Sequence, residues 1–153
     1  MLKAKDIMTK DVITVMPETE VIQAAKLLLE HHINGLPVVD QEGHLKGIIC
    51  QSDLISQQRK IPLPSFFIML DSFVPITSYK NIEKVLQKMS AITVKEAMTA
   101  NPVTVGPETD LEDIATLMVK HSIHTVPVVD QGMIVGIIGK EDILRTLMSG
   151  EKI

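Results

Sequence analysis

An internal duplication constrains the fold of this chain more than any other feature of its 153 residues. Residues 12–20 (VITVMPETE) recur as residues 102–110 (PVTVGPETD), at an offset of 90 positions. Further matches follow in the same order, LPVVD at 36–40 with VPVVD at 126–130, and GII at 47–49 with GII at 136–138. Such an ordered set indicates two structural copies. A copy of about 50 residues cannot bury both faces of a sheet alone, so the copies are expected to pack together.

Each copy predicts the element order β-α-β-β-α, which makes the chain an α/β (α+β) protein. In the first copy, β-branched and aliphatic runs predict strands at Val12–Val15, Leu36–Val39 and Leu45–Cys50. A helix with one apolar stripe is expected from Val21, and a second helix from near Ser52. The second copy repeats this order, with strands at Val103–Val105, Val126–Val129 and Met133–Ile138 and helices from Leu111 and Lys140.

Three helix starts carry capping signals. Thr109 and Glu112 have the S/T-x-x-E spacing of a capping box, in which each side chain accepts a backbone N–H of the other residue. Thr19 holds the equivalent place in the first copy without an acidic partner, so its cap should be weaker. Thr93 and Glu96 form another box, which predicts a short helix leading into the second copy.

The segment between the copies is the part that the repeat does not explain. We divide the chain into a first repeat at residues 1–60, a helical insertion at 61–93 and a second repeat at 94–153. The insertion predicts helices at Ser65–Phe73 and Asn81–Met89, and it holds every aromatic residue of the chain: Phe66, Phe67, Phe73 and Tyr79. Two interpretations are open: the insertion packs on the repeats, or its phenylalanines form a dimer or partner surface.

Charge and composition exclude several classes of protein. The net charge of −4 and the isoelectric point of about 5.7 argue against nucleic acid as a partner. No apolar run approaches the roughly 20 residues that a membrane span needs, and the charged N-terminus does not resemble a signal peptide. The single cysteine, Cys50, cannot close an intrachain disulfide, so we expect a reducing, cytoplasmic location.

No catalytic or metal-binding motif is present in the sequence. It lacks a glycine-rich phosphate loop, a dinucleotide fingerprint and a nucleophile elbow, so we expect no enzyme activity. His31-His32 and His121-x-x-His124 are joined by no cysteine or carboxylate at the usual ligand spacing. We therefore expect no metal site.

The ordered motifs resemble those of cystathionine β-synthase-type (CBS) domains. Asp6-Ile7-Met8-Thr9 opens the first copy, P-V-V-D lies in the middle of each, and G-I-I-x-x-x-D lies near each end. The resemblance implies two repeats packed about a pseudo-twofold axis. It also implies homodimers, and binding of adenosine derivatives such as AMP, ADP, ATP or S-adenosylmethionine to regulate an attached or separate effector.

The family's binding pattern can be carried over position by position. Asp53 and Asp142 stand where the family uses a carboxylate to accept hydrogen bonds from the ribose hydroxyls, although each could equally stabilise a helix start. The segments that match those bordering the base are Thr14 and Thr104 on the first strands, and Gly35, Leu36, Pro37, Val38, Thr125, Val126, Pro127 and Val128 on the second. These strand residues could equally be plain core.

Departures from the family pattern favour adenosine over triphosphate recognition. Cys50 and Gly139 stand where a Ser or Thr hydroxyl often contacts phosphate. His124 and Lys140 offer positive charge in the second copy, which therefore predicts the better anion site. Neither repeat contains Phe, Tyr or Trp, so we expect aliphatic walls and backbone groups to recognise the base.

Two functions are consistent with these residues. The first is a regulatory module that senses an adenosine-type ligand in the cleft between the repeats and acts on its own dimer or on an unidentified effector protein. No cofactor is required for that role. The alternative is a structural dimerisation or docking module with no bound nucleotide, which the missing hydroxyls at Cys50 and Gly139 favour.

Overall fold

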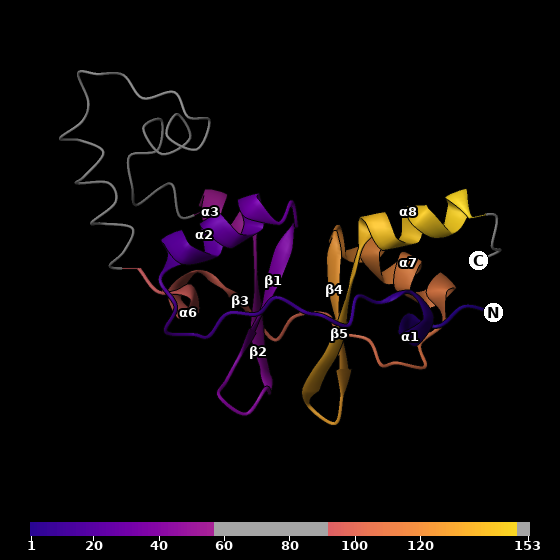
Figure 1. Ribbon diagram of the computed structural model, residues 1–153, viewed down its shortest axis with the longest axis horizontal. Helices are drawn as coiled ribbons and strands as arrows, with labels where there is room; N and C mark the ends of the chain where they lie inside the picture. Colours follow the sequence, from indigo (N-terminus) through magenta and orange to yellow (C-terminus); the bar gives the residue numbers. More distant parts are fainter. Residues whose placement is uncertain (57–91, 150–153) are drawn as a thin grey trace, which may run out of the picture.

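The computed structural model describes residues 1–56 and 92–149, and it places two similar halves side by side (Figure 1). The helices and insertion surface predicted between residues 57 and 91 lie outside the described residues. The first half contains α2 (Val21–Glu30), β1 (Gly35–Val39), β2 (Leu45–Cys50) and α3 (Gln51–Ser56). The second contains α7 (Leu111–His121), β4 (Thr125–Asp130), β5 (Met133–Gly139) and α8 (Lys140–Met148). No described helix has the length and apolar character that a membrane crossing requires.

Each half is built on an antiparallel hairpin, as the sequence predicts. β1 pairs with β2 and β4 with β5, and both hairpins carry a bulge at the equivalent place, after Val38 and after Val128. The apolar stripe of α2 is buried, and α7 buries most of the matching positions. The mixed helix and strand content confirms the α+β class.

The first predicted strand of each copy is reduced to a single parallel bridge. Val15 bridges Val38: the Val15 N–H donates to the Pro37 carbonyl at 3.1 Å, and the Val39 N–H donates to the Val15 carbonyl at 2.9 Å. The next bond on one side would need the N–H of Pro17, and on the other the N–H of Pro37. Proline has no such donor, so the ladder cannot extend. Val105 and Val128 repeat this arrangement in the second half.

Of the three predicted helix caps, two are wrong and one is confirmed. The expected box at Thr109 and Glu112 is wrong, and Thr19 does not cap α2: the residues that precede α7 and α2 are Asp110 and Glu20. The Thr109 hydroxyl instead accepts the Gly106 N–H at 3.0 Å, which closes the turn before the helix. The box at Thr93 and Glu96 is confirmed, since the Glu96 carboxylate accepts the Thr93 N–H.

The two halves exchange their N-terminal segments. α1 (Ala4–Ile7), which opens the first copy, lies against the second half in Figure 1. The Ala4 N–H donates to the Thr109 carbonyl at 2.8 Å, and Thr9 forms a two-bond bridge with Ile137. The Met8 side chain packs on Gly136, where a Cβ would collide with it. The N-terminal segment thus completes the core of the other copy.

The second copy likewise contributes its N-terminal segment to the first half. α6 (Val94–Ala97) and β3 (Thr99–Ala100) lie against the first half, and β3 pairs with the edge of β2. The Val94 N–H donates to the Thr19 carbonyl at 2.8 Å. Met98 packs on Gly47 as Met8 packs on Gly136. Each hydrophobic core therefore contains residues from both copies, Ala4 in the second and Val94 and Ala97 in the first.

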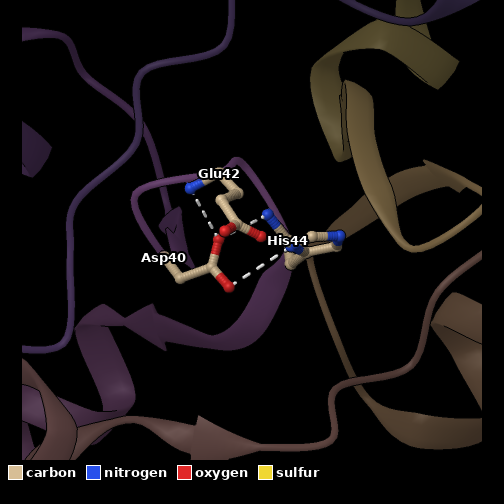
Figure 2. A group of neighbouring side chains, drawn as sticks. All are labelled: Asp40, Glu42 and His44. Carbon is tan, nitrogen blue, oxygen red and sulfur yellow. Dashed lines mark hydrogen bonds and ion pairs between the residues drawn. The ribbon is translucent and has the colours of Figure 1, made fainter.

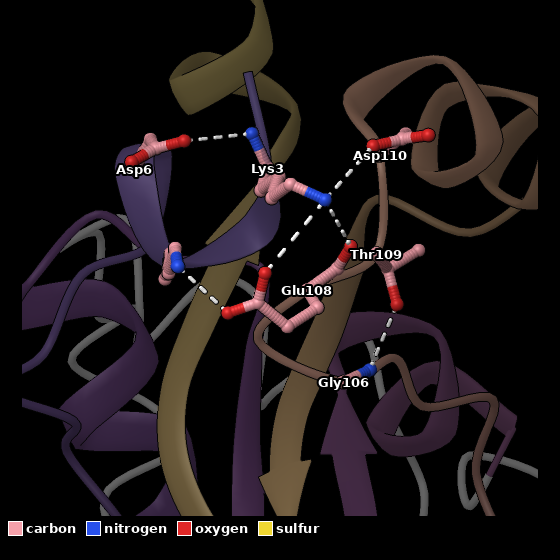
Figure 3. A network of polar contacts seen from close by, with 7 residues as sticks. Lys3, Asp6, Gly106, Glu108, Thr109 and Asp110 are labelled. Carbon is pink, nitrogen blue, oxygen red and sulfur yellow. Dashed lines mark hydrogen bonds and ion pairs between the residues drawn. The ribbon is translucent and has the colours of Figure 1, made fainter. Parts of the chain in front are cut away.

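Exposed ion pairs accompany the exchange at the N-terminus (Figure 3). Lys5 Nζ lies 2.7 Å from Glu108 Oε1, and Lys3 Nζ lies 3.6 Å from Asp110 Oδ1. The mutual hydrogen bond raises the pKa of Lys5 and lowers the pKa of Glu108. These contacts join α1 to the loop before α7 across the boundary between the copies.

Candidate functional site

A cleft opens where the two halves meet. The hairpins are joined at their tips by a bridge between His44 and Met133, and they also come close at Gly35, where a Cβ would lie 3.5 Å from the Thr125 Cβ. The cleft has a volume of about 140 Å³, and residues of both copies line it. Its polar lining includes Thr9, Asp11, Asn34, Thr125, Asp142 and Arg145, and its apolar walls are Ile13, Ile33 and Ile137.

Asp142 lies at the start of α8 and faces this cleft. Its Oδ2 atom accepts the Gly139 N–H at 2.7 Å, which caps the helix, and the residue is only 8% exposed. Its Oδ1 atom lies 3.2 Å from Arg145 Nη2, on a guanidinium whose side chain is 70% exposed. A carboxylate accepts hydrogen bonds at both oxygens, so displacing the exposed arginine would free Oδ1 for a ligand donor.

Asp53 holds the equivalent place at the start of α3, but its second oxygen has a different partner. Oδ2 accepts the Cys50 N–H at 2.8 Å, as in the second copy. Oδ1 accepts the hydroxyl of Thr99 at 3.0 Å, and Thr99 is held in β3. Burial and the neighbouring Asp53 carboxylate raise the pKa of Cys50 to about 12, so this thiol is neutral at physiological pH.

Thr125 contributes a second polar group to the cleft. The residue is 8% exposed, and its hydroxyl makes no hydrogen bond with any described residue. No buried side-chain oxygen among the described residues lacks a partner, so this hydroxyl must be open to the cleft that it lines. Thr125 stands opposite Gly139 in the β4–β5 register, whereas Gly35 stands opposite Cys50 in β1–β2.

The other predicted binding residues do not meet in the cleft. Leu36, Val38, Val126 and Val128 are fully buried in the two cores, and Pro37 and Pro127 are buried beside them. The carbonyls of both prolines already accept strand hydrogen bonds. Thr14 is half-buried and Thr104 is exposed, and neither belongs to the cleft lining. His124 and Lys140 are exposed and also lie outside that lining, although the Lys140 N–H donates to the His124 carbonyl.

Sequence reasoning missed the cleft residues that the exchange delivers. Thr9 and Asp11 follow α1 in the first copy, yet they line a cleft beside Asp142 of the second. The only signal was the equivalence of Thr9 with Thr99 in the repeated M-T motif. That equivalence says the two threonines hold similar places, but it does not say on which half each one lies.

A separate polar cluster lies at the tip of the β1–β2 hairpin (Figure 2). The Asp40 Oδ1 atom accepts the N–H groups of Glu42 and His44 at 2.9 Å each, which stabilises the turn. These backbone donors, the His44 N–H foremost, lower the pKa of Asp40. His44 Nδ1 lies 3.3 Å from Asp40 Oδ2 and 3.4 Å from Glu42 Oε2. The turn itself accounts for this arrangement.

The chain belongs to the CBS domain family. The family model matches residues 4–60 and 94–149, which are the two copies found in the sequence. The CBS domain-containing protein YhcV of Bacillus subtilis is 32% identical, over 99% of this chain and 89% of that protein. The L-aspartate semialdehyde sulfurtransferase of Methanocaldococcus jannaschii is 33% identical, but the chain spans only 23% of its length.

Two solved structures with bound adenosine compounds have the same fold. The CBS domain pair of protein MJ0100, in complex with 5′-methylthioadenosine and S-adenosyl-L-methionine, is 32% identical with a TM-score of 0.72, over 99% of each chain. CBSX2 in complex with AMP is 27% identical with a TM-score of 0.74, over 99% of this chain and all of the other.

Proposed function

We propose that this chain is a regulatory module that binds an adenosine derivative in the cleft between its CBS repeats. One observation carries the proposal: the nearly buried Asp142 carboxylate lies at the wall of a cleft that both copies form. A carboxylate in this position can accept hydrogen bonds from a pair of ribose hydroxyls. The adenosine compounds bound to the two similar CBS pairs support the same class of ligand.

The cleft walls suit a base without aromatic stacking. Ile13, Ile33 and Ile137 offer aliphatic surface from both halves, and Asn34 and Thr125 offer polar groups beside it. Ligand sites commonly combine mostly apolar walls with a few placed polar groups. Base recognition would then rest on aliphatic contact and these few hydrogen bonds.

The charge of the cleft favours ligands with few phosphates. Three carboxylates line it, those of Asp11, Glu141 and Asp142, against the single guanidinium of Arg145. Asp142 and Arg145 pair with each other, which leaves two acidic groups uncompensated within the lining. A triphosphate placed beside them would be repelled. We therefore expect adenosine, 5′-methylthioadenosine and S-adenosylmethionine to bind at least as tightly as ATP.

The size of the cleft suggests how binding would be sensed. Its volume of about 140 Å³ lies below the roughly 300–1,000 Å³ that is typical of ligand pockets. A nucleoside would have to displace Arg145 or shift one half against the other. A ligand changes an equilibrium only through states that it contacts differently, and a cleft shared by both halves meets that condition.

A movement of one half against the other would change how the chain contacts a second copy or a partner protein. Large apolar side chains are exposed on both helices of the second half: Val119 on α7, and Leu144, Leu147 and Met148 on α8. Such side chains are suited to contact with a second copy or with an effector. We expect no catalytic activity and no required cofactor.

Isothermal titration calorimetry on protein freed of bound ligand by unfolding and refolding tests the proposal. Adenosine, 5′-methylthioadenosine, S-adenosylmethionine, AMP, ADP and ATP are titrated in turn, with guanosine as the control for base specificity. Saturable heat with at least one adenosine compound, and none with guanosine, is the expected result. The absence of heat with every adenosine compound would refute ligand sensing.

The structural alternative keeps one observation in its favour. Both aspartates already serve as helix caps through the N–H groups of Cys50 and Gly139, a role that needs no ligand. A dimerisation or docking module would form a tight dimer whose melting temperature no nucleotide changes. Substituting Asp53→Ala and Asp142→Ala would then lower stability but leave partner binding intact.

A further inference from the structure

We propose that the two equivalent aspartates, Asp53 and Asp142, do not have equivalent roles, and that each chain binds one adenosine-type ligand, in the cleft of Asp142 and Thr125. The inference rests on the proposed function and adds which aspartate is used, how many ligands bind and which hydroxyl contacts them. Three pairs of equivalent positions carry it: Gly35 with Thr125, Cys50 with Gly139, and the partners of Asp53 with those of Asp142.

The first pair differs in hydrogen-bonding capacity. Thr125 presents a hydroxyl that is open to the cleft and has no partner among the described residues, although the residue as a whole is only 8% exposed. A ligand that reaches this hydroxyl can form a hydrogen bond with it. Gly35 holds the equivalent position in the first copy and has no side chain to offer.

The second pair differs in space. A Cβ on Gly139 would meet its nearest atoms, Asp142 Oδ2 and the His124 carbonyl, at 3.8 and 3.9 Å, so room remains beside Asp142. In the first copy the Cys50 sulfur fills the corresponding room, and it lies 3.1 Å from where a Cβ on Gly35 would be. That sulfur is the neutral, buried thiol described above and is a weak hydrogen-bonding group.

The third pair differs in how readily the carboxylate can be freed. Thr99, which bonds to Asp53, sits in a strand whose backbone pairs with β2. Arg145, which bonds to Asp142, is an exposed side chain on the same helix, and exposed ion pairs contribute little to stability. Thr9, the counterpart of Thr99, lines the cleft but makes no hydrogen bond to Asp142. A ligand can therefore replace Arg145 more easily than it can replace Thr99.

Matched substitutions in the two copies test the inference by calorimetry, with 5′-methylthioadenosine and AMP as probes. The parent chain should bind one molecule per chain. Asp142→Asn and Gly139→Cys should each weaken binding about tenfold or more, because a lost hydrogen bond to a charged group or a filled cleft has that effect. Asp53→Asn and Cys50→Gly, their counterparts, should change the affinity less than twofold.

Thr125→Val removes the hydroxyl at almost constant shape and should weaken binding about fivefold, whereas Thr104→Val, outside the cleft, should not. Melting temperatures show which variants are folded, and Gly139→Cys keeps the test decisive if Asp142→Asn unfolds. Two molecules per chain, or loss of binding in Asp53→Asn with Asp142→Asn unaffected, would overturn the inference while leaving ligand binding intact. A parent chain that binds neither probe would instead count against the proposed function.

Discussion

The two halves of the molecule share a scaffold but differ at the positions that face their common cleft. The buried aliphatic residues of β1 and β4 match almost exactly in place, and both halves accept a methionine from the other copy onto a glycine. Beside the cleft, by contrast, Gly35 faces Cys50 in one half and Thr125 faces Gly139 in the other. Packing demands keep duplicated positions alike, so divergence at the cleft indicates where the copies have different tasks.

The largest expected effect compares a cysteine in the two equivalent positions. Because burial and Asp53 raise the pKa of Cys50 from 9.0 to about 12, its thiolate fraction at pH 8 falls about a thousandfold below that of an unperturbed thiol. Iodoacetamide labelling of the native protein, followed by mass spectrometry, should be slower by about that factor. In a Cys50→Ser, Gly139→Cys variant the thiol borders the open cleft and should react much faster. Equal rates would mean that the two sites are equally closed.

The next effect compares the glycines that receive the exchanged methionines. A Cβ at Gly47 would lie 2.7 Å from the carbonyl oxygen of Thr99 and 2.7 Å from the Met98 sulfur, and the backbone cannot easily move away. At Gly136 the three atoms nearest to an added Cβ all belong to the flexible Met8 side chain. We expect Gly47→Ala to lower the free energy of unfolding by about 2–3 kcal/mol and Gly136→Ala by about 1 kcal/mol.

Urea unfolding followed by circular dichroism measures both variants. Gly106→Ala is the matched control, because its Cβ would meet nothing closer than the Thr109 hydroxyl at 3.9 Å. A greater loss in Gly136→Ala than in Gly47→Ala would show that the second half is the more tightly packed acceptor of the two.

The smallest expected effect concerns the ion pairs of the exchanged N-terminus. Lys5 and Glu108 are both exposed, and pairs of this kind contribute little at physiological salt, so Lys5→Ala should leave the melting temperature nearly unchanged. What contribution exists is present at neutral pH and is lost as the pH falls through the lowered pKa of Glu108. Melting curves of parent and variant at neutral and acidic pH, in low and high salt, measure this. If Lys5→Ala had a much lower melting temperature than the parent even at high salt, the pair would have a structural role.

The sequence predicts the scaffold well because the same pattern of aliphatic positions occurs in both copies. Hairpins, buried helix stripes and the family all follow from matched aliphatic positions. The length of the first strands could not be predicted from their β-branched residues. Pro17 and Pro37 end the pairing because they lack the N–H groups that the next hydrogen bonds would need, and which residues pair is known only from the fold. The capping box at Thr109 failed for a related reason: its hydroxyl closes the preceding turn instead.

The candidate site is predicted only in part. Asp142 and Thr125 lie in the cleft, but the proline and valine segments beside them turn out to be core. The remaining differences between the copies could not be predicted, because Thr9 and Thr99 hold equivalent places in the repeated sequence. Of the two, Thr99 bonds to the neighbouring aspartate and Thr9 does not. The binding roles of all these residues stay predictions until ligands are titrated.

The exchange of N-terminal segments also bears on how the molecule is made. Leu2 accepts a hydrogen bond from Leu111, so this segment meets its partner only after more than a hundred further residues have been synthesised. The first half likewise stays incomplete until α6 has been synthesised. Contacts of such long sequence separation slow folding and leave apolar edges uncovered meanwhile. Neither copy can finish folding alone, so the unit that can be inherited or fused to other proteins is the pair.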